Sequence, residues 1–305
     1  MPGIKKMQSA GGLNNGTNLG GNVGTCALCD TKNVALAESH LIPKFVYDWI
    51  KNTSINGYLR YSDDVNKREQ DGPKEYLLCA DCEGRLGTLE KELASRLFKK
   101  IANYRLQKSE VLITNNVRLA VLSIFWRTMI TAKHRQDDRT DEDNRLLDEV
   151  IGAWKAQIRD GVCKERIYFA PFYGEPPYFD IDVAFNYFLE RGVGCQDVRF
   201  GDDPHGFFAV FKLPFMFFYM VSDSWTRVNA EKSTELAEGA LSVDGITGIP
   251  DILRRYINQL HSDFERLKLS LNRASRENIA RDFEKAKSVT GAHKSIARSK
   301  PKPGE

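Results

Sequence analysis

Two cysteine pairs with identical spacing constrain the fold of this chain most strongly. They are Cys26-Ala27-Leu28-Cys29 and Cys79-Ala80-Asp81-Cys82, and residues 30–78 separate them. A two-residue spacing lets both sulfurs of a pair reach one ion, and two such pairs complete the tetrahedral site that zinc prefers. Redox dithiols are the alternative, but they favour a thioredoxin-like strand-to-helix context, for which there is no sign here. The sequence therefore predicts a structural Zn²⁺ held by Cys26, Cys29, Cys79 and Cys82.

The other sequence features agree with a reducing compartment. Cys163 and Cys195 lack the paired spacing and are expected to be buried or incidental thiols. No apolar run follows the N-terminal lysines, and the most apolar stretches are too short to span a bilayer. We therefore expect a cytoplasmic protein that does not contact a membrane, and in such a compartment paired cysteines hold metal more often than they form disulfides.

The net charge excludes indiscriminate binding to polyanions. Lys and Arg number 44 and Asp and Glu 41, which leaves +3. A balance this close to zero creates no global field that attracts nucleic acid or anionic lipid. Contact with nucleic acid therefore requires local basic patches.

The chain changes character along its length, and we predict four segments. Residues 1–24 hold seven glycines and four asparagines and read as a flexible leader. Residues 25–105 contain both cysteine pairs and form a zinc-binding module, and residues 110–284 form a larger domain of unknown role. Residues 285–305 carry six basic residues against Glu305 alone. Such a run predicts a disordered tail, with an arm that follows a nucleic-acid backbone as the alternative.

Hydrophobic periodicity predicts the main elements. We expect helices at 43–51, 86–101, 116–133, 141–158 and from 250 to about 287, and strands at 166–172, 197–200, 207–213 and 215–222. The helix at 116–133 is apolar on most sides, so its Arg127 needs a buried partner. The pattern indicates an α+β protein, in which the zinc module joins a larger, mainly helical domain with a small antiparallel sheet.

Glu38-Ser39-His40-Leu41-Ile42-Pro43 and Leu78-Cys79-Ala80-Asp81-Cys82-Glu83 resemble motifs of the HNH endonucleases and their treble-clef relatives. The resemblance covers residues 25 to about 100. It implies a ββα-like treble clef in which a strand ends at His40 and the second cysteine pair opens a helix. It also implies that His40 is the general base that activates water, and that Glu83 is a ligand of a catalytic Mg²⁺ or Mn²⁺. Asn66 is the nearest candidate for the middle residue of the motif.

Basic residues between the cysteine pairs are candidates for nucleic-acid contacts. Arg60, Lys67, Arg68 and Lys74 are interleaved with Tyr58, Tyr61 and Tyr76, a pattern that suits phosphate contacts beside base stacking. They also alternate with acidic residues, so an ordinary solvated loop remains the alternative.

These features predict a metal-dependent, HNH-like nuclease that hydrolyses phosphodiester bonds. The competing hypothesis is a non-catalytic treble-clef zinc module that binds nucleic acid or a protein partner, and a homo-oligomer also fits the sequence. Elsewhere, His205 follows Asp202 and Asp203. These three residues favour a turn over a second metal site.

Overall fold

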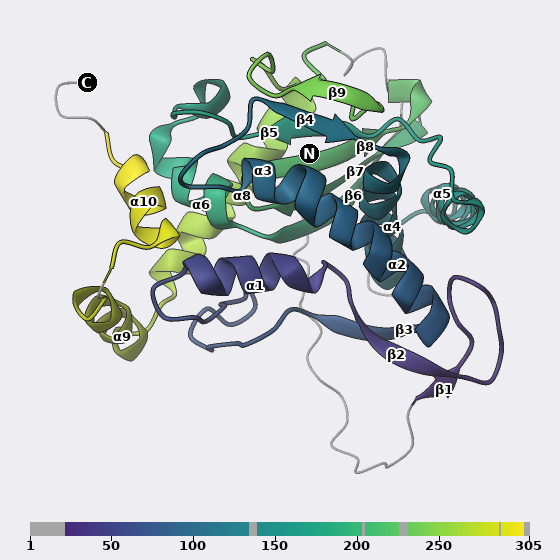
Figure 1. The fold of residues 1–305 in the computed structure, drawn as a ribbon, viewed down its shortest axis with the longest axis horizontal. Helices are drawn as coiled ribbons and strands as arrows, with labels where there is room; N and C mark the ends of the chain where they lie inside the picture. The colour runs from purple at the N-terminus through teal and green to yellow at the C-terminus, as the bar shows by residue number, and fades with distance from the viewer. Residues whose placement is uncertain (1–21, 134–138, 203–204, 226–230, 287, 302–305) are drawn as a thin grey trace.

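The computed structural model describes residues 22–133, 139–202, 205–225, 231–286 and 288–301 (Figure 1). It combines helices with three small antiparallel sheets in this part of the chain, so the predicted α+β class is confirmed. None of the described helices is both long and apolar enough to cross a bilayer. The predicted leader falls almost wholly outside the described residues.

The N-terminal part holds a three-stranded sheet and two helical segments. Its strands are β1 Val23–Gly24, β2 Val34–His40 and β3 Lys74–Cys79, in the order β1-β2-β3. Helix α1 (Lys44–Thr53) follows Pro43, and α2 (Ala80–Glu92) follows β3 without a loop. The helix predicted at 86–101 continues from α2 through a π-helical turn, Leu93–Phe98, into α3 (Lys99–Ile101).

Two long helices connect this part to the rest of the chain. Helix α4 (Asn115–Lys133) is buried on most sides, as predicted, and packs against both α2 and α5 (Asp141–Asp160). Thr140 caps α5 because its hydroxyl accepts from the amide of Asp143, 3.1 Å away, while the Asp143 carboxylate accepts from the amide of Thr140. Gly161 ends the helix at φ 77°, a conformation that glycine adopts without strain.

A four-stranded antiparallel sheet forms the centre of the C-terminal part. Its order is β5 (Tyr168–Pro171), β8 (Met216–Val221), β7 (His205–Leu213) and β6 (Gly194–Asp202). All four predicted strands are present, and the predicted bend at Pro214 is the β7–β8 turn. A second pair, β4 (Glu110–Ile113) with β9 (Gly239–Ser242), was not predicted. Short helical turns Tyr178–Asp180 and Val183–Phe185 lead into α6 (Asn186–Arg191).

The C-terminal helices differ from the prediction. The single helix expected from residue 250 is divided into α8 (Asp251–Leu269) and α9 (Arg273–Glu284), because the side chain of Asn272 caps a new helix by accepting from the amide of Ser275. The segment predicted as a disordered tail contains α10 (Gly291–Arg298), which packs on α6.

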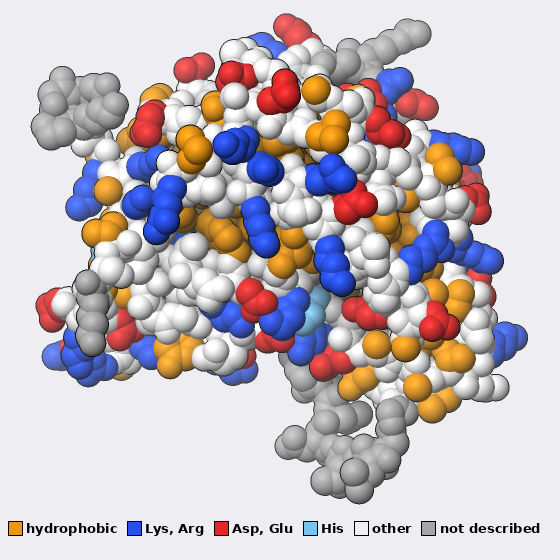
Figure 2. All heavy atoms as spheres, in the orientation of Figure 1, with side chains coloured by type: hydrophobic (Ala, Val, Ile, Leu, Met, Phe, Trp, Pro, Cys, Tyr) orange, Lys and Arg blue, Asp and Glu red, His pale blue; other side chains and the backbone are white. Residues whose placement is uncertain are grey.

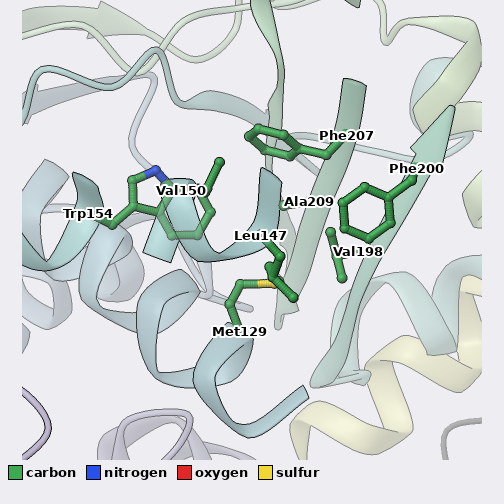
Figure 3. Close-up of a pocket in the computed structure, with 8 residues that line it drawn as sticks. All are labelled: Met129, Leu147, Val150, Trp154, Val198, Phe200, Phe207 and Ala209. Atoms are coloured by element: carbon green, nitrogen blue, oxygen red, sulfur yellow. The ribbon is translucent and has the colours of Figure 1, made fainter. Parts of the chain in front are cut away.

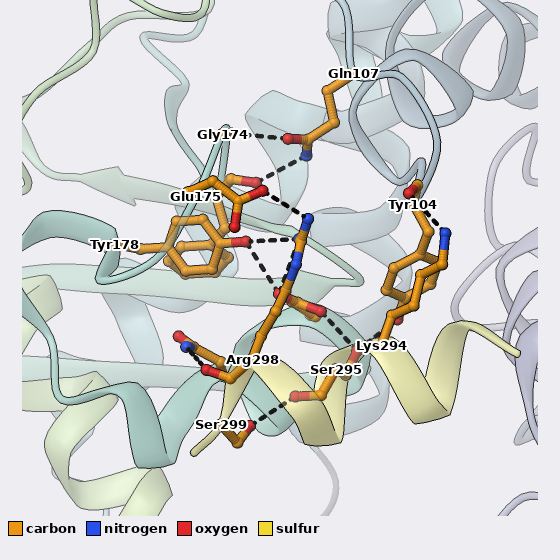
Figure 4. Close-up of polar contacts among 12 residues, drawn as sticks. Tyr104, Gln107, Gly174, Glu175, Tyr178, Lys294, Ser295, Arg298 and Ser299 are labelled. Carbon is orange, nitrogen blue, oxygen red and sulfur yellow. Dashed lines mark hydrogen bonds and ion pairs between the residues drawn. The ribbon is translucent and has the colours of Figure 1, made fainter. Parts of the chain in front are cut away.

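Buried polar contacts explain why α10 is ordered (Figure 4). The carboxylate of Glu190 on α6 is fully buried and accepts from the hydroxyls of Ser295, at 2.6 Å, and Tyr178, at 3.0 Å. Arg298 lies 3.3 Å from the same carboxylate. Glu190 thus gives Ser295 and Arg298 of this basic segment a buried anionic partner, which removing α10 would leave short of partners.

One continuous cluster of buried side chains extends from Cys26 to Ile257. It includes residues of the predicted zinc module and of the predicted second domain. The boundary expected near residues 105–110 therefore marks a change in sequence character but does not separate two hydrophobic cores.

Candidate metal centre and the residues around it

The four predicted cysteines lie together. Their sulfur atoms are all within 4.8 Å of one another, and the Sγ atoms of Cys29 and Cys79 are 3.8 Å apart. A Zn–S bond of about 2.3 Å places tetrahedral ligands about 3.8 Å from each other. The cluster can therefore hold a metal ion such as zinc with little rearrangement.

Local backbone geometry brings the two pairs together. The first pair lies in a tight turn in which the amide of Asp30 donates to the carbonyl of Cys26, at 3.0 Å, and Asp30 has φ 63°. The second pair lies where β3 passes into α2, with Cys79 directly before the first helical residue. The amide of Cys79 donates to the sulfur of Cys26 over 3.3 Å. Amides at the start of a helix favour thiolate over thiol, as a metal ligand requires.

The thiols differ in their surroundings. Hydrogen bonds from the side chain and backbone of Thr31 lower the pKa of Cys29 to about 6. Burial raises the pKa of Cys82 well above its ordinary value. Four sulfurs at this separation cannot all be thiolates without a cation between them, so metal binding releases protons from the more buried ones.

His40 ends β2, and its partner is Asp71. The Nε2 atom of His40 is 2.8 Å from Oδ1 of Asp71, and the side chain of His40 is 14% exposed. The ring also packs against Tyr47, with the centroids 5.9 Å apart. Asn66, the nearest candidate for the middle residue of the motif, contacts the α8–α9 connection instead.

Asp71 is held as a carboxylate. Partial burial opposes ionisation, but hydrogen bonds from Lys74, His40 and the amide of Gly72 hold the pKa of Asp71 well below its usual range. The Nζ atom of Lys74 is 2.9 Å from Asp71 and 3.4 Å from Glu38. His40 and Lys74 are directly opposite in the β2–β3 register, so they share one face of the strand pair.

Glu83 lies against a different residue from the one that the motif implies. Its Oε2 atom accepts from the hydroxyl of Ser39, at 2.6 Å. Ser39 and His40 are consecutive residues of β2, so their side chains leave opposite faces of the strand. The structure thus separates His40 from Glu83, and among the described residues the four cysteines alone form a group of three or more ligands close enough to share an ion.

The predicted nucleic-acid contacts are all engaged within the chain. These contacts are Arg60 with the carbonyl of Val65, Lys67 with Glu69, Arg68 with Asp282, and Lys74 with Asp71 and Glu38. Basic and acidic side chains are also interspersed over the face shown in Figure 2.

Arg127 supplies a link that the sequence did not specify. Its guanidinium is buried, lies 2.6 Å from Oε1 of Glu90 on α2, and donates over 2.8 Å to the backbone carbonyl of His40. The apolar helix around Arg127 predicted that this side chain needs a buried partner. It did not predict that Glu90 and the carbonyl of His40 would be the partners. Helix α4 thereby fixes the end of the strand that carries His40.

The second group weighed as a metal site is described only in part. His205 lies 3.3 Å from Asp143 of α5, and Asp203 is outside the described residues. Nearby, a small space between α4, α5 and the β6–β7 hairpin is lined by apolar side chains, including those of Met129, Trp154 and Phe207 (Figure 3). It presents no polar group to orient a ligand, so we interpret it as a packing junction.

No known protein family, curated protein or solved structure matches this chain.

Proposed function

We propose that the N-terminal part is a treble-clef zinc module of an HNH-like, metal-dependent nuclease that hydrolyses phosphodiester bonds in nucleic acid. Zn²⁺ on Cys26, Cys29, Cys79 and Cys82 has a structural role. Support comes from the thiolate-only donor set, which suits zinc, and from the spacing between Cys29 and Cys79. The observation that carries the catalytic part is the hydrogen bond between His40 and Asp71, at the end of strand β2, which pairs with Cys79 through Leu36.

The pair can act as a general base. A carboxylate only accepts hydrogen bonds, so neutral His40 must carry its proton on Nε2 when it faces ionised Asp71. Its Nδ1 atom then holds the lone pair that takes a proton from water. Asp71 positions the ring and stabilises the imidazolium that forms, and Lys74 lies on the same face to meet a phosphate oxygen.

Glu83 has a structural role in this proposal. The hydrogen bond from Ser39 joins β2 to the first turn of α2 and so braces the second cysteine pair. A catalytic Mg²⁺ or Mn²⁺ would have to bind with substrate on the face of His40, where phosphate oxygens complete its ligand set. The rival proposal is a non-catalytic zinc module that binds nucleic acid or a protein partner, and the separation of His40 from Glu83 favours it.

Cleavage assays with point variants separate the two proposals. Wild type, His40→Ala and Asp71→Asn, each checked for about one zinc per chain, are incubated with plasmid and with single-stranded substrate in Mg²⁺, in Mn²⁺ or without added divalent ion. We expect divalent-ion-dependent cleavage by wild type, none by His40→Ala, and a loss of roughly 10²-fold or more in Asp71→Asn with an altered pH profile. Glu83→Gln is expected to retain cleavage.

The control is His261→Ala, which removes a histidine on α8 that pairs with Glu265. It should leave cleavage unchanged. Cleavage that survives in His40→Ala would refute the assignment of the base. No cleavage by wild type with any ion or substrate, together with retained zinc, would favour the non-catalytic module.

A further inference from the structure

Helix α9 lies against the loop that joins α1 to β3 (Figure 1), and polar groups of the loop contact the helix at both of its ends. At one end, the side chain of Asn66 donates to the carbonyl of Ser270, at 3.3 Å, and accepts from the amide of Asn272, at 2.9 Å. The one buried side chain within α9 is that of Ser275. A helix with so little buried apolar surface can leave its position at low cost in free energy.

At the other end of α9, two donors converge on one carboxylate oxygen. The Oδ2 atom of Asp282 accepts from the side-chain amide of Asn56, at 2.8 Å, and from the guanidinium of Arg68, at 3.3 Å. That guanidinium also lies over the ring of Tyr58, with its carbon 4.8 Å from the centroid. Arg60 is close enough to Arg68 to interact with its charge. The pKa of Arg60 is lowered by burial first and by the like charge of Arg68 second.

We propose that Asn56, Tyr58 and Arg68 form a binding site for a backbone phosphate of a nucleic-acid strand, and that Asp282 occupies this site in the present structure. The class of ligand rests on the proposed function. An amide and a guanidinium that meet at one anionic oxygen suit a phosphate oxygen as well as a carboxylate. A tyrosine ring beside them can stack on a base. Asp282 thus competes with the nucleic acid and lowers its apparent affinity.

The ion pair between Arg68 and Asp282 is weak enough for a phosphate ligand to displace Asp282. The side chains of Arg68 and Asp282 are 31% and 24% exposed, and ion pairs open to solvent change an equilibrium constant by roughly fivefold or less. A strand that also reaches other basic groups of this loop gains several phosphate contacts at once. Binding therefore displaces Asp282 and loosens α9.

Anisotropy titrations of a fluorescein-labelled single-stranded oligonucleotide test the site. The full chain is used in a His40→Ala background without added divalent ions, so that binding is measured without cleavage. Asp282→Asn keeps the shape of the side chain and removes its charge. We expect it to bind roughly fivefold more tightly than its parent, and we expect Arg68→Gln in the Asp282→Asn chain to abolish the gain.

Glu284→Gln is the matched control, since it removes the same charge from an exposed position of α9. It should change the dissociation constant by less than roughly twofold. Hydrogen exchange gives a second measurement, because saturating oligonucleotide should speed the exchange of residues 273–284 in the parent. Equal gains in Asp282→Asn and Glu284→Gln, a gain that survives Arg68→Gln, or no binding by any variant would each overturn the site. Failure of the nuclease proposal appears separately, as absence of cleavage by wild type.

Discussion

Lys212 is fully buried in the four-stranded sheet, and its titration gives a sharp prediction about stability. Its ammonium donates to three backbone carbonyls, those of Leu189 at 2.6 Å, Gly192 at 2.9 Å and Leu213 at 3.2 Å. The rings of Phe172, Phe188 and Phe217 surround it at 5.5 to 5.9 Å. Burial nevertheless lowers the pKa of Lys212 to about 7 from its ordinary value of 10.5.

The sign of the effect follows from proton linkage. Between pH 7 and 10.5 the unfolded chain holds a proton on Lys212 that the folded chain lacks, so the free energy of unfolding rises with pH. The slope is about half of 1.36 kcal/mol per pH unit at pH 7, where the folded group is half deprotonated, and approaches the full value above pH 8, which gives about 2.3 kcal/mol between pH 7 and pH 9. Below pH 7 the contribution is constant. The window ends at pH 9 because burial raises the pKa of Cys195 to about 11, and that thiol acts in the opposite direction.

Urea unfolding at several pH values from 7 to 9 measures this difference. The free energy of unfolding of wild type should gain about 2.3 kcal/mol relative to Lys212→Met, a variant that keeps the length of the side chain and cannot titrate. Lys91→Met, on the exposed side of α2, is the control and should parallel wild type. Parallel curves for wild type and Lys212→Met would refute the reasoning. They would show that the carbonyl and ring cage keeps the ammonium charged despite its burial.

Two further predictions concern the N-terminal part. Arg127→Met is expected to lower the free energy of unfolding by about 3–5 kcal/mol, because it leaves Glu90 and the His40 carbonyl without their partner; urea denaturation measures the loss, and a cost similar to that of a surface arginine change would contradict it. Cys82→Ser should lower the metal content well below that of wild type and lower the thermal midpoint by several degrees, as followed by elemental analysis and circular dichroism, whereas Cys163→Ser should retain the metal.

The elements that the sequence predicted have strong local patterns. The paired cysteines carry their own spacing, and the aromatic strands at 207–213 and 215–222 have a proline between them that marks the turn. The pair formed by β4 and β9 escaped prediction because four-residue strands have too little period to recognise. Helix α10 escaped because its order depends on Glu190, more than a hundred residues earlier in the chain.

The surroundings of His40 illustrate the same limit. Asp71 is 31 positions away from it, and Arg127 is 87 positions away. A single sequence gives no sign of either contact, because both depend on how β2, the following loop and α4 pack together. The motif led instead to Glu83, which is near the second cysteine pair along the chain. Its position after Cys82 could not reveal that Ser39 would face it.

Charged side chains also join the N-terminal part to the rest of the chain, and this bears on how the candidate site is held. Asp30, in the first cysteine turn, pairs with Lys155 and Arg159 of α5. A second contact has the opposite direction: Arg85 of α2, in the N-terminal part, donates to the carbonyls of Ile158 and Arg159 near the end of α5. Each contact places a cation at the C-terminal end of a helix or close to it, where the helix dipole favours positive charge. With Arg127 on the carbonyl of His40, the larger part of the chain therefore positions both the cysteine cluster and the histidine. The geometry of the candidate site depends on residues far outside the motif that first pointed to it.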